Sequence, residues 1–195
     1  CGVKQFIFSS TAAVYGNTKA NYVAETDPLL PESPYGRSKL FAEQVLRDIS
    51  LASPLRYMIL RYFNVAGAQV NLQNGQRTKD ATHLVKVAAQ AAAGHRPGVT
   101  IYGTDYPTPD GTGVRDFVHV QDLAEAHVLA LDYLCAGGNS EALNVGYGQG
   151  FSVREVLETM SKVSGRKFEI LEAQRRSGDL ASVVQEVRTL LDPIL

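Results

Sequence analysis

The chain has 195 residues, of which 45% are hydrophobic and 20% are charged, and its formal net charge is −1. This composition fits one globular domain, or one and a half small ones, with a buried core. The balanced charge argues against a nucleic-acid partner, and no stretch approaches the roughly 18 apolar residues of a membrane span. The two cysteines, Cys1 and Cys135, match neither a disulfide framework nor a zinc pattern, which favours a reducing compartment such as the cytoplasm.

The predicted elements alternate between strands and helices. In chain order they are a strand at residues 4–8, a helix at 34–50, a strand at 56–63, a helix at 84–92, strands at 99–102 and 115–120, a helix capped by Asp122 and ending at 134, a strand at 143–145, a helix capped by Ser152 and ending at 163, and a strand at 167–171. This alternation predicts an α/β fold with mainly parallel strands.

Polar residues follow the first two predicted strands. Ser9 and Thr11 come directly after the first strand, and Asn64 follows the second. Ligands of open α/β sheets bind at the carboxyl ends of the strands, so these residues are candidates for a site. The later segment 103–113 holds three glycines and two prolines, and it is long enough to be a functional loop.

The helix at residues 34–50 places a phenol and an ammonium one turn apart near its start. Tyr35 and Lys39 are separated by four positions, so their side chains share one helix face and can contact a common ligand. A second pair with this spacing, Tyr15 and Lys19, is interrupted by a Gly-Asn turn. Only the first pair is therefore a candidate for shared chemistry.

Several blocks of sequence resemble one family. The segments Ser-Ser-Thr at 9–11, Val-Tyr-Gly at 14–16 and Ser-Pro-Tyr-Gly-x-x-Lys at 33–39 are similar to the extended short-chain dehydrogenase/reductase family. Four later blocks narrow the resemblance to the UDP-sugar 4-epimerases of that family, and it runs from residue 4 to about residue 184. These blocks are Arg-Tyr-Phe-Asn-Val-Ala-Gly-Ala at 61–68, Ile-Tyr-Gly-Thr-Asp-Tyr-Pro-Thr-Pro-Asp-Gly-Thr at 101–112, Val-Arg-Asp-Phe-Val-His-Val-x-Asp-Leu at 114–123 and Arg-Arg-x-Gly-Asp at 175–179.

The resemblance implies an NAD(P)-binding Rossmann-like fold, a doubly wound parallel sheet, with a smaller α/β substrate-binding domain. Residues 1–64 would form the C-terminal half of the Rossmann domain, whose first half lies upstream. Residues 65–195 would form mainly the substrate-binding domain, with segments that return to the Rossmann sheet and a truncated C-terminus. The chain opens at Cys1 and lacks a Gly-x-Gly-x-x-Gly loop. This segment alone is therefore expected to be inactive and to bind NAD weakly.

The activity implied by the resemblance is the interconversion of UDP-galactose and UDP-glucose through a 4-keto intermediate, with tightly bound NAD. Tyr35 is the implied base, and Lys39 favours its phenolate and holds the nicotinamide ribose. Thr11 shares the proton of the 4-oxygen. Ser9 and Phe63, together with Tyr35 and Lys39, are the implied cofactor contacts.

The other implied site residues bind the UDP-hexose. Arg115 and Arg176 suit the diphosphate because guanidinium groups match phosphate oxygens, and Asp179 suits a ribose hydroxyl. His83 stands where the family often has Asn. The implied substrate contacts are Thr11, Asn64, His83, Leu84, Thr100, Tyr102, Arg115, Arg176 and Asp179.

Departures from related sequences narrow the reaction and leave two alternatives open. Ala12 and Ala13 stand where related dehydratases and decarboxylases carry acidic residues, which argues against those reactions. Val183 stands where some relatives have a bulky Tyr, which predicts tolerance of an N-acetyl group. A UDP-pentose 4-epimerase would use the same catalytic residues, and a truncated, non-catalytic nucleotide-sugar-binding fragment is the other reading. The resemblance also implies a homodimer, and no metal ligands are expected.

Overall fold

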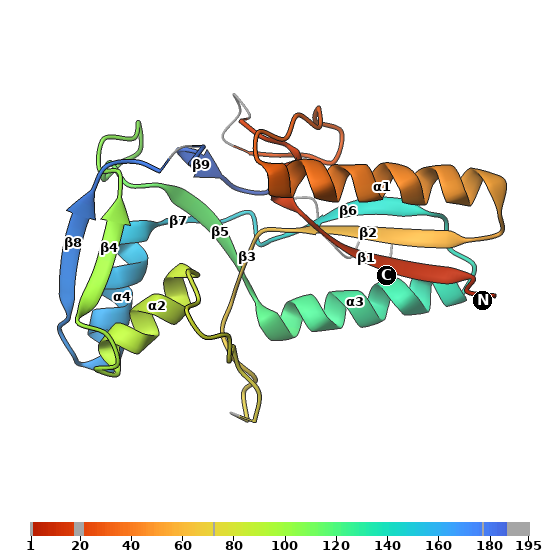
Figure 1. The fold of residues 1–195 in the computed structure, drawn as a ribbon. Coiled ribbons are helices and arrows are strands. Elements are labelled where there is room, and N and C mark those ends of the chain that lie inside the picture. Colours follow the sequence, from red (N-terminus) through yellow and green to blue (C-terminus); the bar gives the residue numbers. More distant parts are fainter. Residues whose placement is uncertain (1, 18–21, 72, 177, 187–195) are drawn as a thin grey trace.

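The computed structural model describes residues 2–17, 22–71, 73–176 and 178–186 (Figure 1). In chain order its elements are β1 (Gln5–Thr11), the 3₁₀ turn η1 (Ala12–Val14), α1 (Pro34–Ala52), β2 (Arg56–Tyr62), β3 (Asn64–Ala66), α2 (Leu84–Ala92), β4 (Gly98–Tyr102), β5 (Val114–His119), α3 (Val120–Cys135), β6 (Glu141–Val145), β7 (Gly150–Ser152), α4 (Val153–Ser164), β8 (Glu169–Ala173) and β9 (Ser182–Val183).

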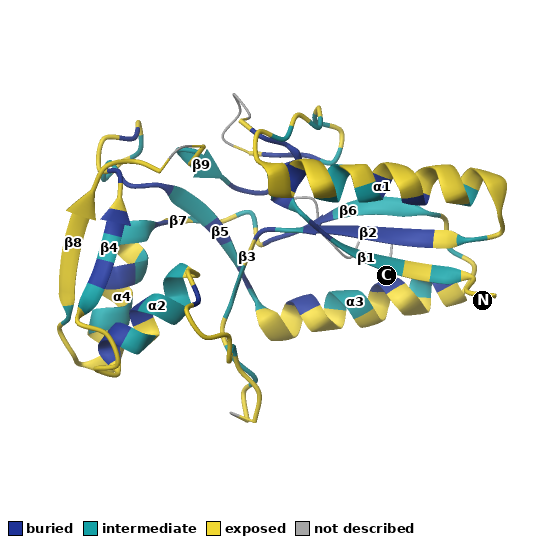
Figure 2. Cartoon of the chain, in the orientation of Figure 1, coloured by how far each residue is buried: buried dark blue, intermediate teal, exposed yellow. Residues whose placement is uncertain are grey.

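The first sheet contains three parallel strands in the order β1-β2-β6, with α1 on one face and α3 on the other (Figure 1). Alternate residues of β2 enter two separate cores. Tyr57 and Ile59 pack with Leu46 of α1, whereas Met58 and Leu60 pack in the cluster that α3 covers. Figure 2 shows β2 buried along most of its length, as expected for a parallel strand covered on both faces.

A second region is built on the parallel pair β4 and β8, with α2 and α4 behind it (Figure 1). Strand β5 connects the two regions because it pairs in parallel with β3 and β9 and antiparallel with β7. The strand order β1-β2-β6 and the helices on both faces of the first sheet form a Rossmann-like α/β fold.

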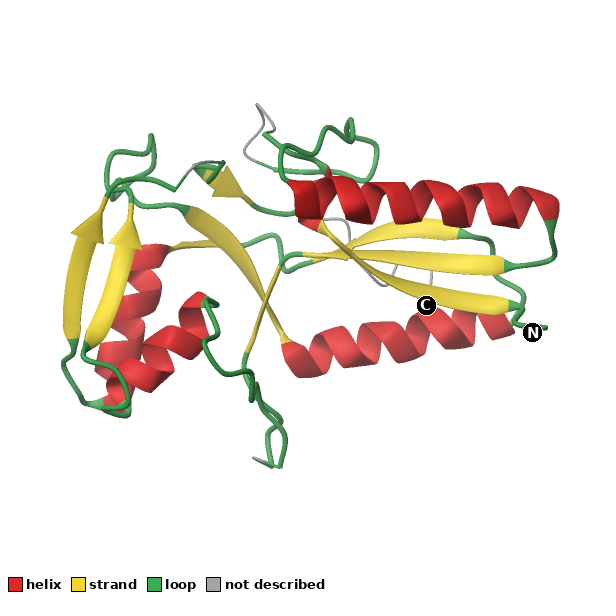
Figure 3. Cartoon of the chain, viewed as in Figure 1, coloured by secondary structure: helices red, strands yellow, loops and turns green. Residues whose placement is uncertain are grey.

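Most predicted elements are present, with corrections at some boundaries (Figure 3). The predicted capping box of α4 is confirmed, because Ser152 accepts from the Glu155 N–H and the Glu155 side chain accepts from the Ser152 N–H. The prediction that Asp122 caps α3 is wrong. The ring of His119 accepts from the Gln121 N–H at 3.2 Å, so Asp122 lies inside the first turn, where a carboxylate favours the helix dipole.

The carboxyl edge of the first strand also differs from the prediction. Ser9 and Thr11 belong to β1 itself, because the parallel ladder continues until Thr11 pairs with Tyr62. The division of the chain at residue 64 stays a prediction, and β6 from the later part of the sequence pairs with β2. Within the described residues, none of the helices combines the length and hydropathy needed to cross a bilayer.

Candidate active site and adjoining cavity

The start of α1 is fixed against the end of β1. The hydroxyl of Ser33 caps the helix by accepting from the Gly36 N–H at 3.0 Å. A Cβ atom at Gly36 would lie 2.5 Å from the carbonyl oxygen of Ala13, so the helix backbone approaches η1 as closely as glycine allows. This contact places Tyr35 beside the segment that follows Thr11.

The predicted Tyr35–Lys39 pair lies on one helix face at this position. The Nζ atom of Lys39 donates to the carbonyl oxygen of Ser9 at 2.9 Å and lies 5.9 Å from the centroid of the Tyr35 ring. The Tyr35 side chain is open to solvent, with 54% of its surface exposed. The arrangement therefore presents an exposed phenol next to an ammonium that the main chain of β1 holds in place.

Ser9 also contacts the opposite helix layer through its side chain. Its Oγ lies 2.9 Å from Nε2 of His127, and Nδ1 of His127 lies 2.8 Å from the carbonyl oxygen of Leu123. Because a carbonyl can only accept, Nδ1 donates to Leu123, and in a neutral imidazole Nε2 then accepts from the Ser9 hydroxyl. The hydroxyl of Ser9 is thus already engaged within the protein.

The same edge of the sheet also carries a threonine hydroxyl and two buried aromatic side chains. The Oγ1 atom of Thr11 accepts from the Ala13 N–H at 3.2 Å, which leaves the hydroxyl proton free to be donated. The Phe63 side chain is buried in a core cluster with Tyr15, and its contact with a cofactor stays a prediction. Tyr15 is buried as well, and the Lys19 that shares its spacing lies outside the described residues.

A buried polar network lies behind this edge and connects α1 to β1, β2 and β6. The Oε2 atom of Glu43 accepts from Nη2 of Arg61 at 2.6 Å, and Glu43 also accepts from the Ser10 hydroxyl. Arg61 donates in turn to the Tyr15 hydroxyl at 2.9 Å, which donates to Asn144 at 2.8 Å. Burial raises the pKa of Tyr15 above its ordinary value, so this phenol stays protonated at neutral pH.

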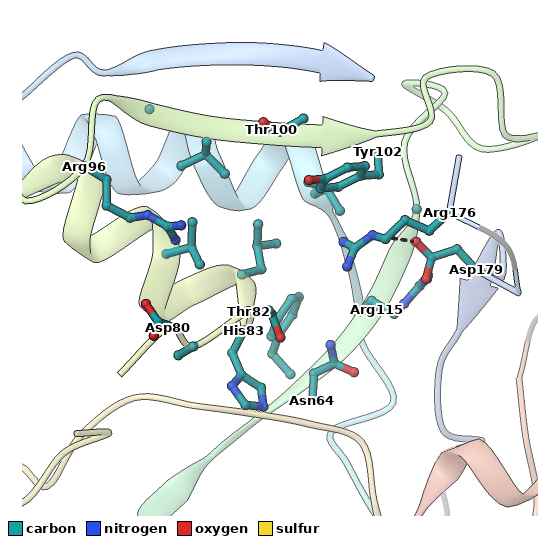
Figure 4. Close-up of a pocket in the computed structure, with 18 of the residues that line it drawn as sticks. Asn64, Asp80, Thr82, His83, Arg96, Thr100, Tyr102, Arg115, Arg176 and Asp179 are labelled. Atoms are coloured by element: carbon teal, nitrogen blue, oxygen red, sulfur yellow. Dashed lines mark ion pairs between the residues drawn. The ribbon is translucent and has the colours of Figure 1, made fainter. Parts of the chain in front are cut away.

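Eight of the nine side chains predicted to contact substrate line one cavity of about 470 Å³ (Figure 4). Thr11, the ninth, lies outside this cavity but near it. Thr11 pairs with Tyr62 on the neighbouring strand. Asn64 follows Tyr62 by two residues, so the Cα atoms of Tyr62 and Asn64 are at most about 7 Å apart. The eight lining residues are Asn64, His83, Leu84, Thr100, Tyr102, Arg115, Arg176 and Asp179.

One end of the cavity carries a cluster of charges (Figure 4). Asp179 lies 3.4 Å from Nε of Arg176 and 3.9 Å from Nη2 of Arg115. The guanidinium of Arg176 stacks on the Tyr102 ring at 4.2 Å from its centroid, and burial lowers the pKa of Arg115 from its ordinary value. One carboxylate therefore faces two guanidinium groups, which leaves net positive charge for an anionic ligand.

His83 occupies the capping position of α2, where its side chain makes no bond to the helix. Its Nδ1 atom lies 2.7 Å from Nε2 of Gln76. The ring lines the cavity and also a larger, mainly apolar hollow over α2 and α3. The structure thus places His83 in the wall of this cavity, and its contact with a substrate stays a prediction.

The sequence analysis missed other residues of the cavity, among them Arg96 and Tyr106. Arg96 reaches the end of the cavity opposite Arg176 (Figure 4), and Tyr106 belongs to the loop between β4 and β5. The glycine and proline content had already marked that loop as a candidate. No pattern in the sequence distinguishes Arg96 from a surface arginine.

The fold and this site define a Rossmann-like α/β protein with a cavity whose charged end carries two guanidinium groups and one carboxylate. The chain belongs to the NAD dependent epimerase/dehydratase family, whose family model matches residues 1–146.

Curated relatives and solved structures agree with this assignment. The chain is 54% identical over 183 residues to the UDP-glucose 4-epimerase of Azospirillum brasilense, covering 94% of this chain and 53% of that protein. It is 48% identical to the enzyme of Lacticaseibacillus casei, of which it covers 55%. The chain thus spans about half the length of the curated relatives it matches.

Among solved structures, the UDP-glucose 4-epimerase of Stenotrophomonas maltophila, with bound NAD and formylated UDP-arabinopyranose, is similar with a TM-score of 0.94 and 42% identity. The match covers 99% of this chain and 58% of that one. The UDP-Glc/GlcNAc 4-epimerase of Campylobacter jejuni is similar with a TM-score of 0.78 and 52% identity, at the same coverage.

Proposed function

We propose that the complete protein is a UDP-glucose 4-epimerase, which interconverts UDP-galactose and UDP-glucose through a 4-keto intermediate and uses NAD. One observation carries this proposal: eight of the residues expected to bind a UDP-sugar line one cavity. Its Asn64 lies two residues beyond Tyr62, the pairing partner of Thr11 at the edge where the Tyr35–Lys39 pair lies. The relatives from Azospirillum and Lacticaseibacillus, which bear this name, support it.

The charged end of the cavity suits the diphosphate of the substrate. Arg115 and Arg176 are the proposed phosphate ligands because planar guanidinium groups pair with phosphate oxygens, and Asp179 can accept from a ribose hydroxyl. Thr100 and Tyr102 of β4 would then flank the uracil. This placement directs the hexose toward Asn64 and onward to Thr11.

At the edge of β1, Tyr35 is positioned to remove and return the proton of the sugar 4-hydroxyl, and Thr11 can donate to the same oxygen. The donor set also fits the ribose end of NAD, since Lys39 offers a fixed ammonium beside the exposed phenol. Ser9 and Phe63 are the other proposed cofactor contacts. When bound, NAD supplies the hydride acceptor for C4 of the sugar.

The decisive experiment is a proton NMR assay of UDP-galactose with the product of the complete reading frame. Appearance of the anomeric signal of UDP-glucose is the expected result. No conversion by a protein that contains NAD and binds UDP would contradict the proposal.

The proposed enzyme is expected to accept UDP-N-acetylglucosamine as well. Val183 of β9 pairs with Arg115 and packs against the core cluster that contains Phe63, so it lies between the charged end of the cavity and the edge of β1. A small side chain at this position leaves room for an N-acetyl group on the sugar. The Campylobacter relative, which is named a UDP-Glc/GlcNAc 4-epimerase, supports this expectation. Turnover of both substrates by NMR is the measurement. The Val183→Tyr control should lose the N-acetylated substrate and keep UDP-galactose.

A UDP-pentose 4-epimerase is the second candidate. The Stenotrophomonas structure holds a modified UDP-arabinopyranose, and a pentose needs the same proton transfer at C4. Competition between UDP-xylose and UDP-galactose in the same NMR assay distinguishes the two. Faster turnover of the pentose would replace the hexose assignment.

A homodimer and a cytoplasmic location complete the proposal. Exposed apolar side chains follow one face of α1 at a four-residue spacing, namely Phe41, Val45 and Ile49. Such a stripe supports association through this helix. Of the two cysteines, Cys135 lies in the described part and is a free thiol, as a reducing compartment would keep it.

A further inference from the structure

The loop between β4 and β5 holds one aromatic ring in a fixed slot. The N–H of Tyr106 donates to the carbonyl oxygen of Gly111 at 2.9 Å, and the Arg175 guanidinium lies 4.0 Å from the centroid of the Tyr106 ring. A Cβ atom at Gly103 would come within 2.6 Å of both the ring and the Arg175 side chain. The loop backbone and Arg175 therefore determine where the Tyr106 hydroxyl points.

Tyr106 lines the cavity, and its hydroxyl oxygen is buried in the cavity wall. Tyr106 is 6% exposed, and its Oη finds no hydrogen-bond partner among the residues that the structure describes. Buried polar groups of proteins are nearly always hydrogen-bonded, and an orphaned one destabilises the protein unless a ligand or water satisfies it. A lone hydroxyl in the wall of a ligand cavity is thus a candidate contact.

The surroundings of the hydroxyl make it a donor. Burial, followed by the charge of Asp179, raises the pKa of Tyr106, so the phenol keeps its proton, although Arg175 and Arg115 act in the opposite direction. Guanidinium groups have no acceptor to offer, and the Asp179 carboxylate is paired with Arg115 and Arg176. A ligand in the cavity can supply the acceptor for this proton.

We propose that the Tyr106 hydroxyl donates a hydrogen bond to a phosphate oxygen of the nucleoside diphosphate that binds in the cavity, next to Arg115. A donor among guanidinium groups favours an anionic acceptor over a neutral one. The identity of the nucleoside as uridine rests on the proposed function, whereas the contact with phosphate follows from the charged end of the cavity.

The test is calorimetric titration of the complete protein and its Tyr106→Phe variant with UDP and with uridine. Loss of one hydrogen bond to a charged group should weaken UDP binding by about 10- to 100-fold. Uridine should bind both proteins equally, and the melting temperature should not fall. The matched control is Tyr57→Phe, an equally buried tyrosine in the core between the first sheet and α1, which should leave UDP affinity unchanged.

Equal UDP affinity of the wild type and Tyr106→Phe would overturn the inference, as would an equal loss for uridine and UDP. If the wild type binds ADP but not UDP, the proposed function fails, and the same comparison with ADP and adenosine decides the role of Tyr106. A wild-type protein that binds no nucleoside diphosphate would overturn both.

Discussion

Replacement of Tyr35 by Phe in the complete protein is expected to lower the turnover of UDP-galactose by about 100- to 10,000-fold. The substitution removes only the phenol oxygen that exchanges a proton with the 4-hydroxyl. The side chain is 54% exposed at the first turn of α1, so its ring contributes little to the core. The free energy of unfolding and the affinity for UDP should therefore stay close to the wild-type values.

The rate is measured by proton NMR and the affinity by calorimetry. Tyr22→Phe is the matched control, because Tyr22 is 52% exposed and does not line the substrate cavity. A Tyr35→Phe enzyme with turnover within a few fold of the wild type would assign the proton transfer to another group. A parallel loss of UDP affinity would instead indicate a structural role for the hydroxyl.

The largest expected effect on stability comes from Glu43→Gln. Glu43 and Arg61 are almost fully buried and form a 2.6 Å ion pair, so the substitution leaves the Arg61 charge without its partner. Breaking one side of a buried pair typically costs about 3 to 5 kcal/mol. Urea denaturation of the complete protein should show a loss of this size in the free energy of unfolding.

Arg47 provides an internal control for the Glu43 prediction. It contacts the same carboxylate at 4.0 Å, but its side chain is 45% exposed, so Arg47→Gln should cost less than about 1 kcal/mol. Substitutions of Glu43 and Arg47 with equal effects would show that the buried network adds nothing beyond a surface pair.

Much of the fold could be predicted from the sequence because the long elements carry a clear pattern. The α1 prediction, residues 34–50, differs from Pro34–Ala52 only at the C-terminal end. The short strands β3, β7 and β9 were missed, since two or three residues show no periodicity and form only through pairing with β5.

The part of the candidate site that lies in local sequence motifs could be predicted. The Tyr35–Lys39 pair follows from helix spacing, and the resemblance supplied the residues that line the cavity. The contact between Ser9 and His127 joins residues far apart in the sequence, so no local pattern reveals it. Tyr106 is similar, because a hydroxyl without a partner is recognised only when its surroundings are known.

Ser9 of β1 forms hydrogen bonds with side chains of both flanking helices, α1 and α3. Its carbonyl oxygen holds the ammonium of Lys39 from α1, and its hydroxyl holds the imidazole of His127 from α3. A sideways displacement of α3 against the sheet therefore pulls on the same residue that anchors the Lys39 ammonium. The reactive face of α1 and the packing of a helix on the opposite side of the sheet thus depend on one shared residue.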